Sequence, residues 1–402
     1  MFPFFCPWDT IIPVSEPEIH RLTIEKIVSR GAGMGRLDGR VVFVPYTLPG
    51  EEVEVALEKG GRDFAHARLS RVLVPSEERV EPVCPLFTIC GGCDFQHMDY
   101  RSQGKIKKEI FREALRRIGG VRLEADGEEG SGIPFVESPP LGYRNRAQVH
   151  RTGDGNWGFK MAGSHRVVEV PFCPVASPEI NLFFAGRFPE KPPQDHGRTV
   201  LFGAEGELCV RRDRDIEVRL LEKRLRLSTD CFFQGNLVML RRLLADVFQG
   251  FSGDFALDLY GGVGTFGVFL ADRFNRVLSV EENPVAAAYA RENLPRGKGE
   301  VFSGSVERWL AAPGGRRGFP RGAGPDLVVV DPPRSGLSPP VRDFLLRERP
   351  PALIYLSCDA ATLARDAAIL LAGSYEMTDW TVYDFYPQTS HLEVLCRFAA
   401  SS

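Results

Sequence analysis

The chain lacks a surplus of positive charge. Its 50 Lys and Arg residues face 53 Asp and Glu residues, so the net charge is −3. Nucleic-acid-binding proteins usually carry a basic surplus, so the overall charge does not indicate such a partner. A local surplus exists, because residues 101–120 hold seven basic side chains against two glutamates. A solvated helix face explains that run at least as well.

Long apolar runs are also missing. No stretch approaches the roughly 20 apolar residues that a membrane-spanning helix needs, so we expect no membrane partner. Residues 1–17 contain Phe and Pro but neither the basic region nor the continuous apolar core of a signal peptide. We therefore expect an extension at 1–17 without structure of its own, and a cytoplasmic protein. A length of 402 residues with 43% hydrophobic and 26% charged side chains excludes a disordered chain and predicts two or three domains.

The nine cysteines do not form a disulfide framework, because their number is odd and the expected compartment is reducing. Three of them lie close together in the segment C-P-L-F-T-I-C-G-G-C, as Cys84, Cys90 and Cys93, and the other six are scattered. These three cysteines are therefore the ones whose spacing carries information about function.

Residues 19–75 read as short strands separated by turns. Apolar and polar residues alternate in Leu22–Val28, Arg40–Val44, Glu52–Leu57 and Ala65–Val72. Turn signals lie between them, the first in Gly31–Gly35. Several short strands at this spacing predict a small OB-like barrel.

The rest of the chain divides into a strand-rich and an alternating part. A helix is predicted over Arg101–Ile118, an acidic, Gly-rich loop at 124–131, and mostly strands over 136–226. From about residue 233, helices alternate with strands, and the strands are Phe255–Tyr260, Val277–Glu281, Leu327–Asp331 and Ala352–Ser357. Helices are expected at Gly267–Asp272, Pro284–Leu294 and Pro340–Arg347. This alternation predicts an open, mostly parallel sheet.

A glycine loop follows the first of these strands, in Asp258-Leu-Tyr-Gly-Gly-Val-Gly-Thr-Phe266. Glycines between a strand and a helix let the backbone approach a ligand at the strand's carboxyl end. Glu281 ends the next strand, where an acidic side chain can accept hydrogen bonds from ribose hydroxyls. The glycine spacing differs from G-x-G-x-x-G, so the loop favours an adenosyl cofactor over a dinucleotide.

Two further motifs follow buried-looking strands. Asp331-Pro-Pro-Arg334 comes after Leu327–Val330, and Ser357-Cys358-Asp359 comes after Leu353–Leu356. Both are expected at the sheet edge where ligands bind. An isolated cysteine is most often simply buried, but a thiolate at this edge can add to an electron-poor double bond. His391-Leu-Glu393 is expected on a late strand, where alternation puts His391 and Glu393 on one face.

These motifs together resemble those of the RNA (uracil-5-)-methyltransferases, which methylate carbon 5 of uridine with S-adenosylmethionine. The resemblance covers nearly the whole chain after about residue 18. The barrel is similar to a TRAM domain, and the cysteine cluster with the Gln96, His97, Tyr100 and Gln103 that follow it is similar to the family's iron–sulfur segment. F-F-Q-G-N at 232–236, the glycine loop, D-P-P-R, S-C-D and T-S-H-L-E complete the series in the family's order.

The resemblance implies an α/β plus β fold with three domains. These are an OB-like TRAM barrel at 18–76, a central mostly-β domain with the iron–sulfur segment at 77–100 and 121–230, and a Rossmann-like methyltransferase domain at 101–120 and 231–402. It also implies the ligands and roles of ten residues. A [4Fe–4S] cluster is held by Cys84, Cys90, Cys93 and the distant Cys173; S-adenosyl-L-methionine is contacted by Gln234, Tyr260, Glu281 and Asp331; Cys358 is the nucleophile and Glu393 the base. Four thiolates also suit a tetrahedral zinc ion, so a zinc site stays open.

The implied reaction starts with addition of the Cys358 thiolate to carbon 6 of uracil, which makes carbon 5 nucleophilic. The resemblance favours 23S ribosomal RNA as the partner, with tRNA as the alternative, and a monomeric protein. Methylation of cytosine carbon 5 is disfavoured, because the motif after the corresponding strand then carries a second cysteine and D-P-P-R has none. A catalytically silent RNA-binding protein is the alternative from another class.

Overall fold

The computed structural model describes residues 18–123, 132–188, 197–210, 214–312, 324–373 and 375–401. The expected extension at 1–17 and the expected loop at 124–131 lie outside these ranges. The chain divides into two compact units, Met1–Arg79 and Val80–Ser402. In the ranges described, no helix is both long and apolar enough to cross a membrane.

Within residues 18–79, five strands close into a barrel in the order β1-β2-β3-β5-β4. Their bounds are β1 Ile19–Ile27, β2 Gly33–Leu37, β3 Arg40–Val44, β4 Glu52–Gly60 and β5 Phe64–Val74. Ile24, Val42 and Val53 are buried inside, because alternate side chains of a strand point to the same face. The predicted N-terminal barrel is confirmed.

Strand β2 corrects one expectation. The glycines of Gly31–Gly35 were expected in a turn, but the turn comes earlier. The backbone N–H of Gly31 donates to the oxygen of Val28 at 2.9 Å, and Arg30 and Gly31 have φ of 73° and 80°. Strand β2 begins at Gly33. A Cβ on Gly35 would lie 2.4 Å from the backbone oxygen of Thr23, so this glycine lets β1 and β2 approach closely.

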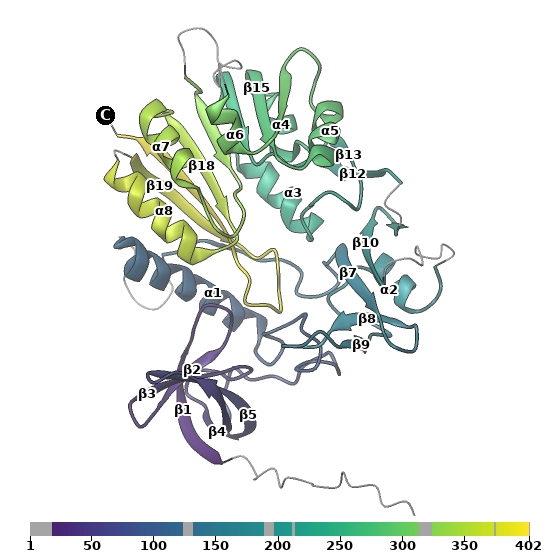
Figure 1. Ribbon diagram of the computed structural model, residues 1–402, viewed down its shortest axis with the longest axis vertical. Coiled ribbons are helices and arrows are strands. Elements are labelled where there is room, and N and C mark those ends of the chain that lie inside the picture. Colours follow the sequence, from purple (N-terminus) through teal and green to yellow (C-terminus); the bar gives the residue numbers. More distant parts are fainter. Residues whose placement is uncertain are drawn as a thin grey trace, which may run out of the picture. The chain divides into compact units, whose positions relative to one another are not determined.

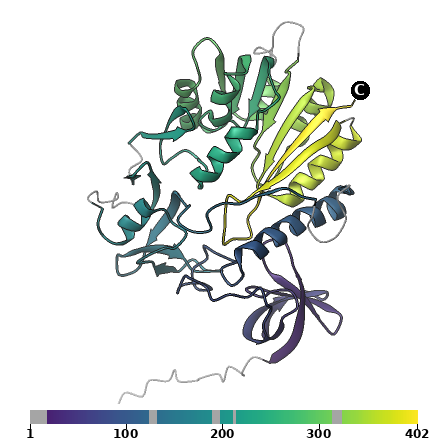
Figure 2. The ribbon, with the colours of Figure 1, turned by 180° about the vertical axis from the view of Figure 1, so that it is seen from behind.

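The second unit is built around a large mixed sheet (Figures 1 and 2). In its described part, eight strands follow the order β16-β15-β14-β17-β18-β20-β19-β6. The strands from β16 to β18 are parallel, and β20 is antiparallel to both of its neighbours. Their bounds are β6 Phe135–Val136, β14 Gly253–Leu259, β15 Phe274–Glu281, β16 Gly299–Ser303, β17 Leu327–Val330, β18 Ala352–Ser357, β19 Tyr375–Tyr383 and β20 Glu393–Ala400.

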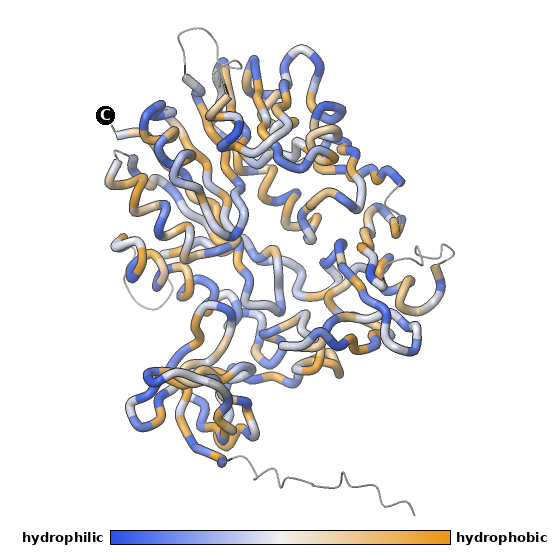
Figure 3. Tube along the Cα trace, in the orientation of Figure 1, coloured by the Kyte–Doolittle hydropathy of each residue, from blue (hydrophilic) through white to orange (hydrophobic). Residues whose placement is uncertain are grey.

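Helices cover both faces of this sheet. Their bounds are α3 Leu237–Asp246, α4 Thr265–Leu270, α5 Pro284–Asn293, α6 Val306–Ala311, α7 Pro339–Glu348 and α8 Ala360–Ala372. Side chains on one face of the strands, such as Val329 and Ile354, pack with α3, α4 and α5. The alternate residues, such as Val328 and Leu353, are also fully buried, and α6, α7 and α8 contact one another in a row. Apolar residues accordingly follow the central strands (Figure 3), and the predicted Rossmann-like architecture is confirmed.

Helix α1 (Tyr100–Ala114) begins at Asp99, whose carboxylate accepts a hydrogen bond from the backbone N–H of Ser102 at 3.0 Å. It continues as a π-helical turn, η1 (Leu115–Gly119), which ends at Gly120 in the left-handed conformation. Both α1 and η1 pack against α8. The helix predicted over Arg101–Ile118 is confirmed, with one turn of altered pitch.

A smaller sheet follows α1 and β6 in the sequence and precedes the other strands of the large sheet. Among the described residues it has five strands, in the order β11-β10-β7-β8-β9. The bounds are β7 Arg146–Arg151, β8 Trp157–Lys160, β9 Val167–Glu169, β10 Arg198–Ala204 and β11 Glu207–Cys209, with helix α2 Pro178–Phe184 packed against β10. Val149, Ile180 and Leu201 form its core.

The hairpin of β12 (Ile216–Leu220) and β13 (Lys223–Leu227) packs elsewhere. Its inward side chains, among them Val218 and Leu225, belong to the core of the large sheet, and β12 contacts α3 while β13 contacts α5. The domain boundary expected at residue 230 is therefore better placed before the hairpin, and we propose that position.

Candidate active site and cysteine cavity

Five of the ten predicted site residues come from one edge of the large sheet. They follow or begin its strands in this way: Tyr260 after β14, Glu281 at the end of β15, Asp331 after β17, Cys358 after β18 and Glu393 at the start of β20. The first four strands are parallel, so their carboxyl ends meet at one edge. Strand β20 starts at the same edge, because Ser357 pairs with Val394. The expectation that Asp331 and Cys358 share an edge is confirmed.

The glycine loop between β14 and α4 is shaped by backbone that side chains would obstruct. A Cβ on Gly261 would lie 2.0 Å from the Ser279 hydroxyl and 2.8 Å from the Asp258 carboxylate. Tyr260 has φ of 66°, a conformation that non-glycine residues hold mainly where the surroundings enforce it. Gly261 therefore lets the loop pack closely on β15. A Cβ on Gly262 would meet no atom within 4 Å, so the backbone there is open to close approach by a ligand.

Glu281 is held against this loop by its carboxylate. One oxygen accepts a hydrogen bond from the backbone N–H of Gly262 at 2.8 Å, and the other accepts one from Asn283 at 2.7 Å. Each carboxylate oxygen has a second acceptor site. The side chain is thus oriented and still able to accept hydrogen bonds from two adjacent hydroxyls.

Two acidic groups have raised pKa values, Asp258 within β14 and Asp331 at the edge itself. Burial raises the pKa of Asp258 to about 7, although the Ser279 hydroxyl donates to it. Burial, together with the negative charge of Asp258, raises the pKa of Asp331 to about 7. Both groups therefore titrate near neutral pH, which is common at functional sites.

The charge of Glu393 acts on the Cys358 thiol. Burial raises the pKa of the Cys358 thiol to about 11, and the charges of Glu393 and Asp331 add to the shift while Arg334 opposes it. Glu393 is only 2% exposed, and burial followed by the charge of Asp331 raises its pKa well above the usual value. The structure therefore places a thiol and a carboxylate with a raised pKa close enough for their charges to interact.

Gln234 is connected to this neighbourhood through Tyr386. The Tyr386 hydroxyl donates to the side-chain oxygen of Gln234 at 3.5 Å. Burial, followed by the charge of Glu393, raises the pKa of Tyr386, so the ring lies near the base. Gln234, Cys358 and Glu393 are thereby brought together, whereas Tyr260 and Glu281 lie at the glycine loop.

His391 corrects another expectation. It was predicted on a strand, on the same face as Glu393, but β20 begins only at Glu393. His391 is exposed at the end of a loop while Glu393 is buried. Its ring lies against Tyr386, with ring centroids 5.9 Å apart, and the guanidinium of Arg334 is 3.4 Å from its Nδ1.

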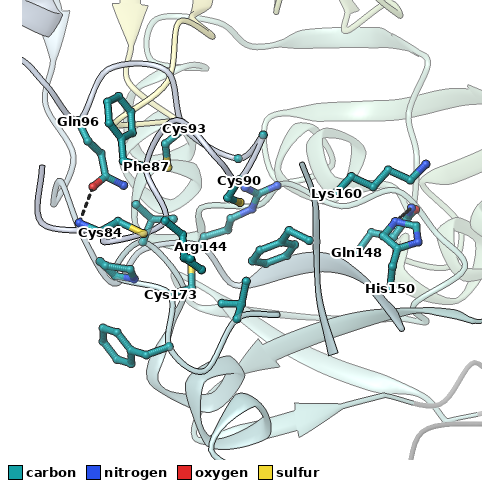
Figure 4. Close-up of a pocket in the computed structure, with 18 residues that line it drawn as sticks. Cys84, Phe87, Cys90, Cys93, Gln96, Arg144, Gln148, His150, Lys160 and Cys173 are labelled. Atoms are coloured by element: carbon teal, nitrogen blue, oxygen red, sulfur yellow. Dashed lines mark hydrogen bonds between the residues drawn. The ribbon is translucent and has the colours of Figure 1, made fainter. Parts of the chain in front are cut away.

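The four cysteines implied as cluster ligands form a second site. Cys84, Cys90, Cys93 and Cys173 line one cavity of about 190 Å³, and their side chains surround Arg144 (Figure 4). The negative charges of neighbouring thiols contribute to the raised pKa of Cys90, after burial. Cys173 therefore joins the three clustered cysteines despite 80 residues of separation from Cys93.

Two observations define the chemistry of this cavity. Gln96 is buried, and its side-chain oxygen accepts a hydrogen bond from the backbone N–H of Cys84 at 3.0 Å. Arg144 lowers the pKa values of Cys90, Cys93 and Cys173 against the larger effect of burial. Within the described ranges, no three His, Cys, Asp or Glu side chains are arranged to hold a single metal ion.

Sequence reasoning missed two groups at the sheet edge, Arg334 and Tyr386. Arg334 ends D-P-P-R, so its place next to Asp331 was available from the motif. Tyr386 lies in a loop without periodicity, and only its contacts with Gln234 and His391 mark it.

Together, the sheet, the glycine loop and the acidic residue at the end of β15 define a Rossmann-like methyltransferase. Residues 208–398 match the family described as tRNA (Uracil-5-)-methyltransferase, and residues 15–70 match the TRAM domain. An uncharacterized RNA methyltransferase of Treponema denticola is 33% identical over 388 residues, which cover 90% of this chain and 94% of that protein. The chain belongs to the RNA (uracil-5-)-methyltransferase family.

Two named relatives add detail. The 23S rRNA (uracil(1939)-C(5))-methyltransferase RlmD of Pectobacterium atrosepticum is 30% identical over 437 residues, which cover 94% of this chain and 93% of that protein. The crystal structure of the Pyrococcus abyssi tRNA (uracil-54, C5)-methyltransferase in complex with S-adenosyl-L-homocysteine aligns with a TM-score of 0.70 at 25% identity. The alignment covers 94% of this chain and all of that one.

Proposed function

We propose that this protein transfers a methyl group from S-adenosylmethionine to carbon 5 of a uridine in 23S ribosomal RNA. The observation that carries the proposal is the meeting of Cys358, Asp331 and Glu393 at one sheet edge, next to a glycine loop. Family membership supports the reaction, and the relative from Pectobacterium supports the ribosomal substrate.

The residues around the glycine loop fit an adenosyl cofactor. Glu281 retains acceptor sites for the ribose hydroxyls, and the backbone of Gly262 faces open space, since a Cβ there would meet no atom within 4 Å. Gln234, Tyr260, Glu281 and Asp331 hold the cofactor in this proposal. When bound, it supplies an electrophilic methyl group and leaves as a neutral thioether.

Cys358 opens the reaction when its thiol loses its proton to solvent and the resulting thiolate forms a bond between its sulfur and carbon 6 of uracil. The electron pair of the C5=C6 bond then moves toward carbon 5 and the 4-carbonyl oxygen, so carbon 5 becomes nucleophilic and takes the methyl group. Glu393 accepts the proton of carbon 5. The C–H electron pair re-forms the double bond, and the sulfur–carbon bond breaks to release the Cys358 thiolate.

The raised pKa of Glu393 suits that last step. A carboxylate with an ordinary pKa is a weak base at neutral pH, whereas burial makes Glu393 a stronger one. The target base must leave its stack to reach a half-buried thiol, so an unpaired nucleotide in a loop is the substrate expected.

The substrate is tested by incubating the protein with methyl-labelled S-adenosylmethionine and either 23S rRNA or tRNA. We expect label in 23S rRNA and 5-methyluridine after digestion. Label in tRNA alone would reject the ribosomal substrate, and 5-methylcytidine would reject uracil. Binding of RNA with no label in either would favour the silent RNA-binding protein.

The cysteine cavity fits a [4Fe–4S] cluster held by Cys84, Cys90, Cys93 and Cys173. Four thiolates are the usual ligands of such a cluster. All four cysteines line one cavity of about 190 Å³, so the fold brings four thiol ligands to one space. The guanidinium of Arg144 favours the thiolate forms, as its effect on three of the thiols indicates.

Metal analysis of anaerobically purified protein tests the cluster. We expect about four irons and about four sulfides per chain, and their loss in Cys173→Ser. Cys209→Ser is the matched control, because Cys209 is buried on β11 and does not line the cavity. One zinc per chain without sulfide would contradict the cluster and favour the zinc site.

A further inference from the structure

The loop of residues 384–392 joins β19 to β20 and leads directly into Glu393. Asp384 and Phe385 are fully buried in it, and Gln388 is 8% exposed. Loops usually run over the surface, because buried backbone needs partners for its polar groups. This loop therefore depends on hydrogen bonds from other segments.

The first set of partners comes from Asp94, which directly follows Cys93. One oxygen of its carboxylate accepts hydrogen bonds from both the backbone N–H and the hydroxyl of Ser390, at 3.0 and 2.9 Å. In return, the backbone oxygen of Gln388 accepts from the N–H groups of Asp94 and Phe95, each at 3.0 Å. Two short segments are thus joined by four hydrogen bonds.

The second partner is Gln103 on α1, which is fully buried. Its side-chain oxygen accepts from the backbone N–H of Gln388 at 2.9 Å, and its amide nitrogen donates to the side-chain oxygen of Gln388 at 3.0 Å. The same nitrogen contacts the backbone oxygens of Phe95 and Met98 at 3.2 and 3.3 Å. One amide therefore fixes the loop and the segment that carries Asp94.

The third partner is Lys107, one turn further along α1. Its ammonium group donates to Asp384 at 2.6 Å and to the backbone oxygen of Tyr386 at 2.9 Å. Both charged side chains are completely buried. Burying an ion pair gains little stability compared with apolar packing, so a role in fixing geometry is the better explanation.

We propose that Asp94 and Gln103 are positioning residues for Glu393, and that they act by holding the 384–392 loop. The inference rests on the proposed function and extends it, because it assigns a role in proton removal to residues more than 280 positions away in sequence. Neither residue touches the substrate in this account. Asp94 and Gln103 determine the position of the Glu393 carboxylate relative to carbon 5 of the uracil.

The step that depends on this placement is the last one. Glu393 must accept the carbon-5 proton while the C–H pair re-forms the double bond and the bond between Cys358 and carbon 6 breaks. If the base is displaced, addition and methyl transfer still proceed, but release fails. The methylated RNA then stays attached to Cys358.

The test uses Gln103→Leu and Asp94→Ala with ordinary uridine in the substrate RNA and methyl-labelled S-adenosylmethionine. We expect turnover to fall about tenfold or more, with KM for RNA unchanged. Labelled RNA should remain bound to the protein on a denaturing gel. The wild type should release its product and show no such band.

Asp99→Ala is the matched control for loss of helix stability. Asp99 caps the same helix, and its carboxylate accepts hydrogen bonds from the backbone N–H and the hydroxyl of Ser102. These bonds lie within the first turn of α1, so the replacement of Asp99 should lower the melting temperature without trapping labelled RNA. Asp94→Asn should restore release, because a single oxygen of Asp94 accepts both bonds from Ser390 and asparagine keeps one such oxygen. A trapped adduct in Asp99→Ala would overturn the proposal, and so would the lack of one in Gln103→Leu and Asp94→Ala.

Hydrogen exchange gives a readout that does not need activity. We expect faster exchange of the backbone amides of Gln388 and Ser390 in Gln103→Leu, with the strands of the large sheet unchanged. Unchanged exchange in the loop would overturn the positioning role even if turnover fell. If the wild type itself methylates no RNA, the proposed function fails, and the exchange result still decides whether these residues hold the loop.

Discussion

Replacing Cys358 by alanine is expected to abolish methylation of RNA, with a loss of about 10⁴-fold or more in turnover. Without the thiolate, nothing adds to carbon 6, and carbon 5 stays a poor nucleophile. Binding of RNA should remain within about twofold, because the side chain is small and only half-buried at the sheet edge. Labelled-methyl transfer and a filter-binding assay measure the two effects separately.

Cys396→Ala is the matched control for this variant. Cys396 is fully buried on β20, opposite Tyr355 of β18, so its replacement perturbs the same part of the sheet without removing the nucleophile. We expect lower stability and nearly normal turnover. Normal turnover in Cys358→Ala would remove the thiol from the mechanism.

Replacing Glu393 by glutamine is expected to have the second largest effect, a fall in turnover of about 10²- to 10⁴-fold. Addition of Cys358 and methyl transfer do not require this base, so they should continue. Proton removal should stop, and labelled RNA should accumulate on the protein with ordinary uridine. A loss of turnover without trapped RNA would place Glu393 before methyl transfer and contradict its role.

The same variant has a pH signature. The Glu393 charge contributes to raising the pKa of the Cys358 thiol to about 11, and only the thiolate reacts with an alkylating agent. Removing that charge lowers the thiol pKa, so the alkylation profile of Glu393→Gln should shift to lower pH. Iodoacetamide labelling of Cys358 between about pH 8 and pH 10 measures it. A profile that coincides with the wild type would show that the two groups do not interact.

The sheet edge was accessible to sequence reasoning because each motif directly follows a predicted strand. Glu281, Asp331 and Cys358 end or follow parallel strands, and parallel strands place their carboxyl ends together. The alternation of helices and strands predicts this shared edge even when the order of the strands in the sheet is unknown. The roles of these residues stay predictions until the variants are measured.

The hydrogen bonds that hold the loop before Glu393 could not be predicted from the sequence. Lys107 meets Asp384 across 277 residues, and Asp94 meets Ser390 across 296. Contacts between residues so far apart leave no periodic signal in the sequence. The strand before the C-terminus was therefore predicted to include His391, whereas the loop continues to Leu392 and β20 begins at Glu393. Strand β6 illustrates the same limit, because Phe135 pairs with Val382 at the far edge of the large sheet.

The most direct test of the account is denaturing electrophoresis of the protein with S-adenosylmethionine and RNA that contains 5-fluorouridine. Fluorine cannot be removed as a proton by Glu393, so the bond between Cys358 and carbon 6 should persist. We predict a protein band shifted by the attached RNA, dependent on the cofactor and missing in Cys358→Ala. Methylation of ordinary RNA without any shifted band on the fluorinated RNA would contradict the covalent mechanism.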